Sequence, residues 1–206
     1  MERKEIKEKS KEQIRGNIFK FFVMMVITAV INGVCMKIEE IGPALAFVLG
    51  AILQMGVIMA YLKLAKGDNV EVVDVFSGFN MPIKAILINL LTTIFTALWS
   101  LLFVIPGIIK SLSYFAAPYI LAENPEMSTL DAITKSREMM DGHKADLFVL
   151  QLSFFFWWML VPFTFGLAVI YVVPYMSTAM TNFYLNLKEN KTVEAEVVSA
   201  EVVEEK

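Results

Sequence analysis

Several apolar runs about twenty residues long and free of carboxylates limit how this chain can fold more than any other feature. A membrane-spanning α-helix needs about 20 predominantly apolar residues to cross a hydrocarbon core of about 30 Å. Four runs meet this requirement plainly, and a fifth, which contains Pro174 and Asn182, meets it without a formal charge. The four are 18–36, 44–62, 85–105 and 147–165, and the fifth is 167–187.

Composition supports the same class of protein. Hydrophobic residues make up 57% of the 206 residues and charged residues only 19%, which is more apolar surface than a soluble domain of this size buries. The net charge of -3 gives no reason to expect nucleic acid as a partner. One cysteine and one histidine leave no disulfide and no zinc site of the usual kind. We therefore expect an all-α, polytopic membrane protein without metal or cofactor.

The segment 107–122 decides the topology, because it is short and contains Lys110 and Pro118. Loops rich in Lys and Arg stay cytoplasmic. If the segment crosses, Lys37 and Lys110 are the only two of the 18 Lys and Arg residues on the outer side. This charge bias predicts six spans, both termini in the cytoplasm and Lys110 near the outer interface. A re-entrant helix over 107–122 is the alternative.

An internal repeat supports an even number of spans. Residues 9–23 and 135–149 align with six identities in 15 positions, and a fainter copy lies around Gly78. We interpret the chain up to residue 187 as one membrane domain of three units, 1–62, 63–124 and 125–187. Each unit would consist of a cytoplasmic amphipathic helix, a glycine that ends it (Gly16, Gly78 or Gly142) and a hairpin of two spans.

The span interiors hold no carboxylate or histidine, the groups that ion coupling and proton relays usually need. Polar side chains are present, however, and could line a cavity or hydrogen-bond across helix contacts. We favour helix contacts. These side chains are Asn32, Gln54, Asn89, Thr92, Thr93, Thr96, Gln151 and Asn182.

Candidate contact residues follow Ser128, which with Asp131 predicts the N-cap of an amphipathic helix. Its basic residues and those just after it could contact lipid headgroups or a partner protein: Lys135, Arg137, His143 and Lys144. Four prolines could kink the spans: Pro106, Pro118, Pro162 and Pro174. The acidic tail, residues 188–206, is expected to be disordered and cytoplasmic, or to fold as a short strand or helix on a partner.

Three stretches carry a resemblance to a known family: IPGIIKSLSY at 105–114, APYILAENP at 117–125, and KSREMM at 135–140 with the residues up to Phe148. They closely resemble the family called domain of unknown function 975, uncharacterised integral membrane proteins of Gram-positive bacteria. The likeness covers almost the whole chain except the tail. The chain is also distantly similar to the membrane domain fused to some glycerophosphodiester phosphodiesterases. The resemblance implies a bacterial plasma membrane, and it carries over no catalytic residue.

The leading hypothesis is a non-enzymatic protein of membrane organisation, lipid interaction or assembly with a membrane partner, including a second copy of itself. The alternative is a transporter or permease for a lipid-like or amphipathic solute. The amphipathic helices motivate the first hypothesis, and the prolines and polar span residues motivate the second.

Overall fold

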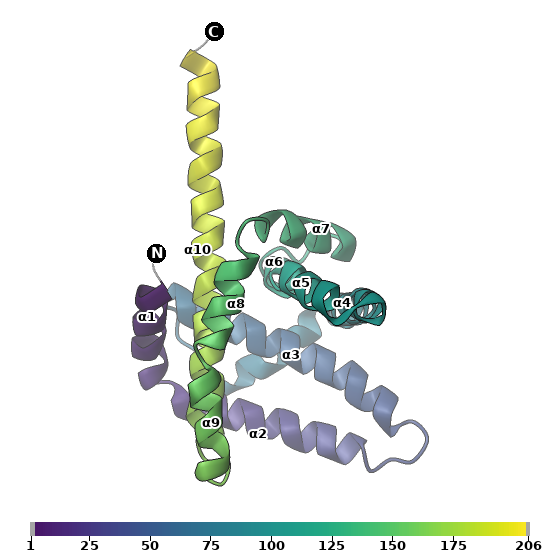
Figure 1. Cartoon of the computed structure of the whole chain (residues 1–206). Helices are drawn as coiled ribbons and strands as arrows, with labels where there is room; N and C mark the ends of the chain where they lie inside the picture. The colour runs from purple at the N-terminus through teal and green to yellow at the C-terminus, as the bar shows by residue number, and fades with distance from the viewer. Residues whose placement is uncertain (1–2, 205–206) are drawn as a thin grey trace.

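The computed structural model of the chain is all α-helical over the described residues and has eleven helical elements there (Figure 1). It describes residues 3–204, with side chains as far as residue 192 except at position 102. The elements are α1 (Arg3–Arg15), α2 (Ile18–Cys35), α3 (Gly42–Lys66), the 3-10 helix η1 (Val72–Asn80), α4 (Pro82–Leu102), α5 (Val104–Tyr114), α6 (Ala117–Glu123), α7 (Thr129–Met139), α8 (Lys144–Leu152), α9 (Phe155–Phe163) and α10 (Val169–Glu204).

Five helical segments in the described part of the chain are long and apolar enough to cross a membrane. They are Ile18–Cys35, Gly42–Lys66, Pro82–Leu101, Val104–Glu123 and Lys144–Phe163. The prediction of an all-α chain with membrane-like helices is therefore confirmed. The six-span arrangement is not, because the run 167–187, which forms the first part of α10, is not among the five.

The polar helix α1 lies beside α10 over this same stretch (Figure 1). Asn182 of α10 hydrogen-bonds to Ser10, and Arg15 lines a surface hollow with Tyr171. Charged side chains are expensive in hydrocarbon. The α1 side of α10 thus faces protein and polar groups. Figure 1 also shows α2 and α3 running across the direction of α10, so the helices are not all parallel.

Helix α3 is central to the packing and contributes to both apolar clusters of the core. In one cluster, the rings of Phe21 and Tyr61 stack with centroids 4.2 Å apart and join α2 to α3. On another side η1 packs directly on the α3 backbone. A Cβ atom at Gly78 would overlap the carbonyl oxygen of Ile52, and one at Gly56 would overlap that of Val75.

This contact corrects the prediction for the second repeat unit. The segment around Gly78 is not a surface amphipathic α-helix but a 3-10 helix held against α3. Lys63 reinforces the contact through an ion pair of 2.6 Å to Asp74. The glycine is required here for a close backbone approach, not to end a helix. Gly142 alone of the three repeat glycines takes the predicted left-handed conformation, with φ of 81°.

The first and third repeat units bury corresponding residues, although nothing in their sequences alone requires this. Between residues 3 and 24, each of the five buried residues is followed 126 positions later by another buried residue. The pairs are Ile6 with Ala132, Ser10 with Ser136, Ile14 with Met140, Phe21 with Leu147, and Met24 with Leu150. This coincidence agrees with the repeat hypothesis for these two units.

The prolines have different local roles. Pro118 lies in the first turn of α6, just after the break that separates α5 from α6. Pro106 lies in the first turn of α5, and Pro162 lies near the end of α9. Pro174 is inside α10, whose helix continues through it and on to Glu204. The backbone of the tail is thus helical as far as it is described, where the sequence predicted disorder.

Candidate functional site

A cavity of about 500 Å³ lies between α3, α4 and the α5–α6 segment. Its polar lining consists of uncharged amides and hydroxyls, and the remainder is apolar. The polar residues are Gln54, Asn89, Thr92, Thr93, Thr96, Ser100, Ser111 and Tyr114, and apolar surface comes from Met55, Ile58, Ile88 and Phe115. The lining residues lie in three of the candidate membrane spans. The cavity is therefore a neutral, partly polar site among helices that are otherwise strongly apolar.

Helical spacing explains why α4 supplies most of the polar groups. Asn89, Thr92, Thr93 and Thr96 recur at intervals of three and four residues, which places them on one side of the helix. Asn89 Nδ2 donates to Gln54 Oε1 of α3 at 3.2 Å. Thr92 Oγ1 donates to the carbonyl of Ile88 at 2.7 Å. These bonds leave much of the donor and acceptor capacity of the lining available to a ligand.

Gln54 also borders a second cavity, of about 470 Å³, between α2, α3 and α10. Asn32, Thr28 and Pro174 contribute to its lining. The interpretation of the polar span residues as helix contacts therefore holds for Asn182, which bonds to Ser10 of α1 at 2.8 Å. It is incomplete for the others, because Gln54, Asn89 and the three threonines line a cavity.

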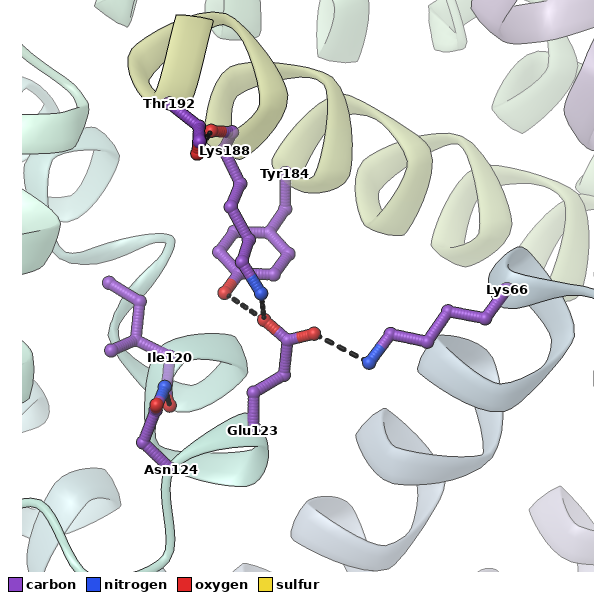
Figure 2. A network of polar contacts seen from close by, with 7 residues as sticks. All are labelled: Lys66, Ile120, Glu123, Asn124, Tyr184, Lys188 and Thr192. Carbon is purple, nitrogen blue, oxygen red and sulfur yellow. Dashed lines mark hydrogen bonds and ion pairs between the residues drawn. The ribbon is translucent and has the colours of Figure 1, made fainter. Parts of the chain in front are cut away.

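A buried carboxylate joins three helices, α3, α6 and α10 (Figure 2). Glu123, at the end of α6, has a side chain only 6% exposed. Its Oε1 lies 2.6 Å from Lys66 Nζ of α3, and its Oε2 lies 2.8 Å from Lys188 Nζ of α10. The hydroxyl of Tyr184 donates to Oε2 at 2.6 Å. One carboxylate thus fixes the ends of α3 and α6 against α10.

The network joins two helices, α3 and α6, that also line the cavity. Ala51 to Ile58 of α3 form one wall, and Pro118 of α6 belongs to the opposite wall. Glu123 holds these two helices together by their last residues, Lys66 and itself. Loss of the carboxylate would leave the buried hydroxyl of Tyr184 without its partner, which is costly. The side chains of Lys66 and Lys188 are 47% and 49% exposed, so water can solvate them.

The structure separates the four basic residues that the sequence grouped as one contact site. Arg137 and Lys144 line a groove together with Lys110. His143 lines a different cleft with Arg3 and Lys4, and its Nδ1 lies 3.6 Å from Asp146 Oδ2. Lys135 is exposed and lines neither. Two surfaces therefore replace the single predicted one.

The structure brings Lys110 into one groove with Arg137 and Lys144, which the charge count placed at opposite membrane interfaces. Lys110 shares their groove because α7 folds back along α5, where Ser136 Oγ donates to the carbonyl of Ser113 at 2.8 Å. Its ammonium group rests 4.5 Å from the centroid of the Trp99 ring. This cation–π contact partly replaces hydration.

Sequence reasoning missed Glu123 and its partners as a cluster. Glu123 is part of the APYILAENP stretch, and Lys66 and Lys188 follow apolar runs, which made each one look like an ordinary residue at a span end. Nothing local indicates that residues 57 and 65 positions apart meet at one carboxylate. A carboxylate flanked by apolar residues on its N-terminal side was the one available signal.

These features define a helical membrane-type protein with a neutral cavity and a buried carboxylate that joins α3, α6 and α10. The sequence matches the family described as Protein of unknown function (DUF975) over residues 1–110 and again over residues 101–191. The chain belongs to this family, as its sequence motifs indicated. No curated protein and no solved structure matches the chain.

Proposed function

We propose that this protein is a non-enzymatic membrane protein that binds a lipid, or a similar amphipathic molecule with an uncharged polar group, in the cavity between α3, α4 and α5–α6. The observation that carries this proposal is the neutral polar lining inside candidate membrane spans. Amides and hydroxyls hydrogen-bond an uncharged polar group without the cost of burying a charge. The apolar part of the lining suits hydrocarbon.

The composition of the lining favours binding over catalysis. General acid–base or nucleophilic chemistry needs a titratable group within reach of a nucleophile. In the part of the chain that the structure describes, the lining contains no carboxylate, histidine or cysteine. Glu123 is close in sequence to Pro118 of the lining, but its oxygens are engaged by two lysines and a tyrosine.

The test is photolabelling of the purified full chain in phosphatidylcholine nanodiscs with a photoactivatable diacylglycerol. Thr93→Trp fills the cavity and is expected to reduce labelling of α4 and α5–α6 about tenfold, a typical change when an anchoring contact is lost. Leu98→Trp is the matched control, because Leu98 is on the same helix, 56% exposed and outside the lining. Equal labelling in the two variants would contradict the proposal.

Transport of such a molecule is the second candidate function. It is favoured by the helix break at Phe115–Ala116, since Phe115 and Pro118 both line the cavity and a broken helix can rearrange at the break. Proteoliposome flux that Pro118→Ala reduces while photolabelling persists would select transport. Photolabelling without flux would select binding alone.

For the cellular setting we propose the plasma membrane of a bacterium, with both chain termini in the cytoplasm and α10 as the sixth crossing. Support comes from the cleft that Arg3 and Lys4 of α1 share with Asn190 of α10, which puts the start of α1 beside the exit of α10. Accessibility of single cysteines at Arg3 and Asn190 to an impermeant thiol reagent, from either side, tests this. The exposed apolar side chains of α9, including Phe156 and Phe163, are available to lipid, a membrane partner or a second copy.

A further inference from the structure

The groove between α5, α7 and the start of α8 is a second recognition surface, separate from the cavity. Its volume is about 340 Å³. Lys110 and Ser113 reach it from one side of α5, whereas Ser111 and Tyr114 of the same helix line the cavity. A single helix therefore separates a neutral site from a basic one.

Three cations from three elements meet in this groove: Lys110 of α5, Arg137 of α7 and Lys144 of α8. Two carboxylates, Glu138 and Asp141, also line it. Asp141 is engaged, because its Oδ1 lies 3.3 Å from Lys144 Nζ. The groove thus carries one more positive than negative charge.

The other two cations have no carboxylate partner in the described part of the chain. Lys110 contacts the Trp99 ring and makes no ion pair there. No hydrogen bond or ion pair of the Arg137 guanidinium is present among those residues, although Glu138 is its neighbour in sequence. An unpaired guanidinium in a groove presents several parallel N–H donors to whatever enters.

We propose that this groove binds a phosphate group. Arginine forms bidentate hydrogen bonds to phosphate oxygens, and lysine adds a point charge, so Arg137 and Lys110 together suit a tetrahedral oxyanion. The phosphate can belong to an anionic membrane lipid or be free inorganic phosphate. Lys110 lies in a candidate membrane span. Basic pockets between such helices bind the phosphate of anionic lipid headgroups.

The experiment measures binding to the detergent-purified full chain in two arms: native mass spectrometry with phosphatidylglycerol, and calorimetry with inorganic phosphate. Arg137→Gln is expected to weaken binding about tenfold, because it removes a charge-assisted bidentate contact. Lys110→Gln is expected to act in the same direction. Asp141→Asn, which frees Lys144, is expected to tighten binding.

The matched control is Lys135→Gln, because Lys135 has the same charge, lies on the same helix and is outside the groove. It is expected to change the binding affinity less than about twofold, because solvent screens an exposed charge outside the groove. If inorganic phosphate does not displace the bound lipid, the lipid is the source of the phosphate group. If inorganic phosphate displaces it, free phosphate is the source. If Arg137→Gln and Lys135→Gln behave alike in both arms, the proposal is overturned, while the cavity proposal is unaffected.

Discussion

Helices α1 and α7 occupy corresponding places in the first and third units and bury corresponding residues, but they are held by different partners. Ser10 of α1 accepts a hydrogen bond from Asn182 of α10, and its own hydroxyl donates to Ile6 of the same helix. Ser136 of α7 donates to the carbonyl of Ser113 on α5. Equivalent buried serines therefore connect their helices to different parts of the fold.

The difference shows how a repeated segment can acquire two roles. Helix α1 is fixed by several polar contacts, because Gln13 also bonds to Asn182 and to the carbonyl of Ala65. In addition, Lys7 donates to Ser153 between α8 and α9. Helix α7 has fewer such anchors, and its Arg137 makes no ion pair within the described part of the chain. One copy serves mainly to brace the fold, and the other is available for recognition.

The largest expected effect is on the shared buried positions. Ile14→Ala and Met140→Ala should each lower the free energy of unfolding by about 2–5 kcal/mol, the usual range for such truncations at fully buried sites. Both side chains are 0% exposed. Unfolding in detergent measures the effect. A large loss of unfolding free energy for only one of the two variants would show that equally buried positions do not stabilise the two units equally.

An intermediate effect should separate the two helices. Asn182→Ala removes the amide donor that Ser10 Oγ and Gln13 Oε1 share, which costs about 1–3 kcal/mol. Hydrogen exchange should rise in α1 and not in α7. Ser136→Ala is the counterpart, expected to cost about 1 kcal/mol and to loosen α7 alone. Exchange that rises in both helices for either variant would mean that they are not anchored independently.

The smallest effect concerns Lys7, whose pKa is lowered by burial from its usual value of 10.5. Between that lowered pKa and 10.5 the unfolded chain binds more protons than the folded chain, so stability should rise with pH across this window. Below the lowered pKa the penalty of burying the charged form is fully present. Lys7→Met should remove this rise, measured as the difference between the two unfolding curves near pH 10. If stability rose equally with pH in the native chain and in Lys7→Met, the prediction for Lys7 would be wrong.

The sequence was sufficient for the helical class, because apolar runs reflect the length needed to cross a bilayer. It also located the N-cap of α7, where Asp131 N–H donates to Ser128 Oγ at 3.1 Å. Both features depend on local chemistry.

Features that depend on contacts between distant segments could not be predicted. The close approach of Gly78 to Ile52 needs the backbone path of η1, and a glycine in sequence fits a helix end equally well. The meeting of Glu123 with Lys66 and Lys188 needs three helices to converge. The meeting of Lys110 with Arg137 and Lys144 likewise requires α7 to fold back along α5, which charge counting does not reveal.

Helix α10 continues well past the contact at Lys188 and ends at Glu204, which makes it a rod standing clear of the other helices (Figure 1). At about 1.5 Å per residue, the part beyond that contact is roughly 24 Å long. Glu123 contacts this rod at its base, through Lys188. A small change in the direction of the α10 axis at that point therefore produces a much larger displacement at Glu204. The same carboxylate also contacts Lys66, the last residue of α3, so the base of the rod is joined directly to a helix that lines the cavity.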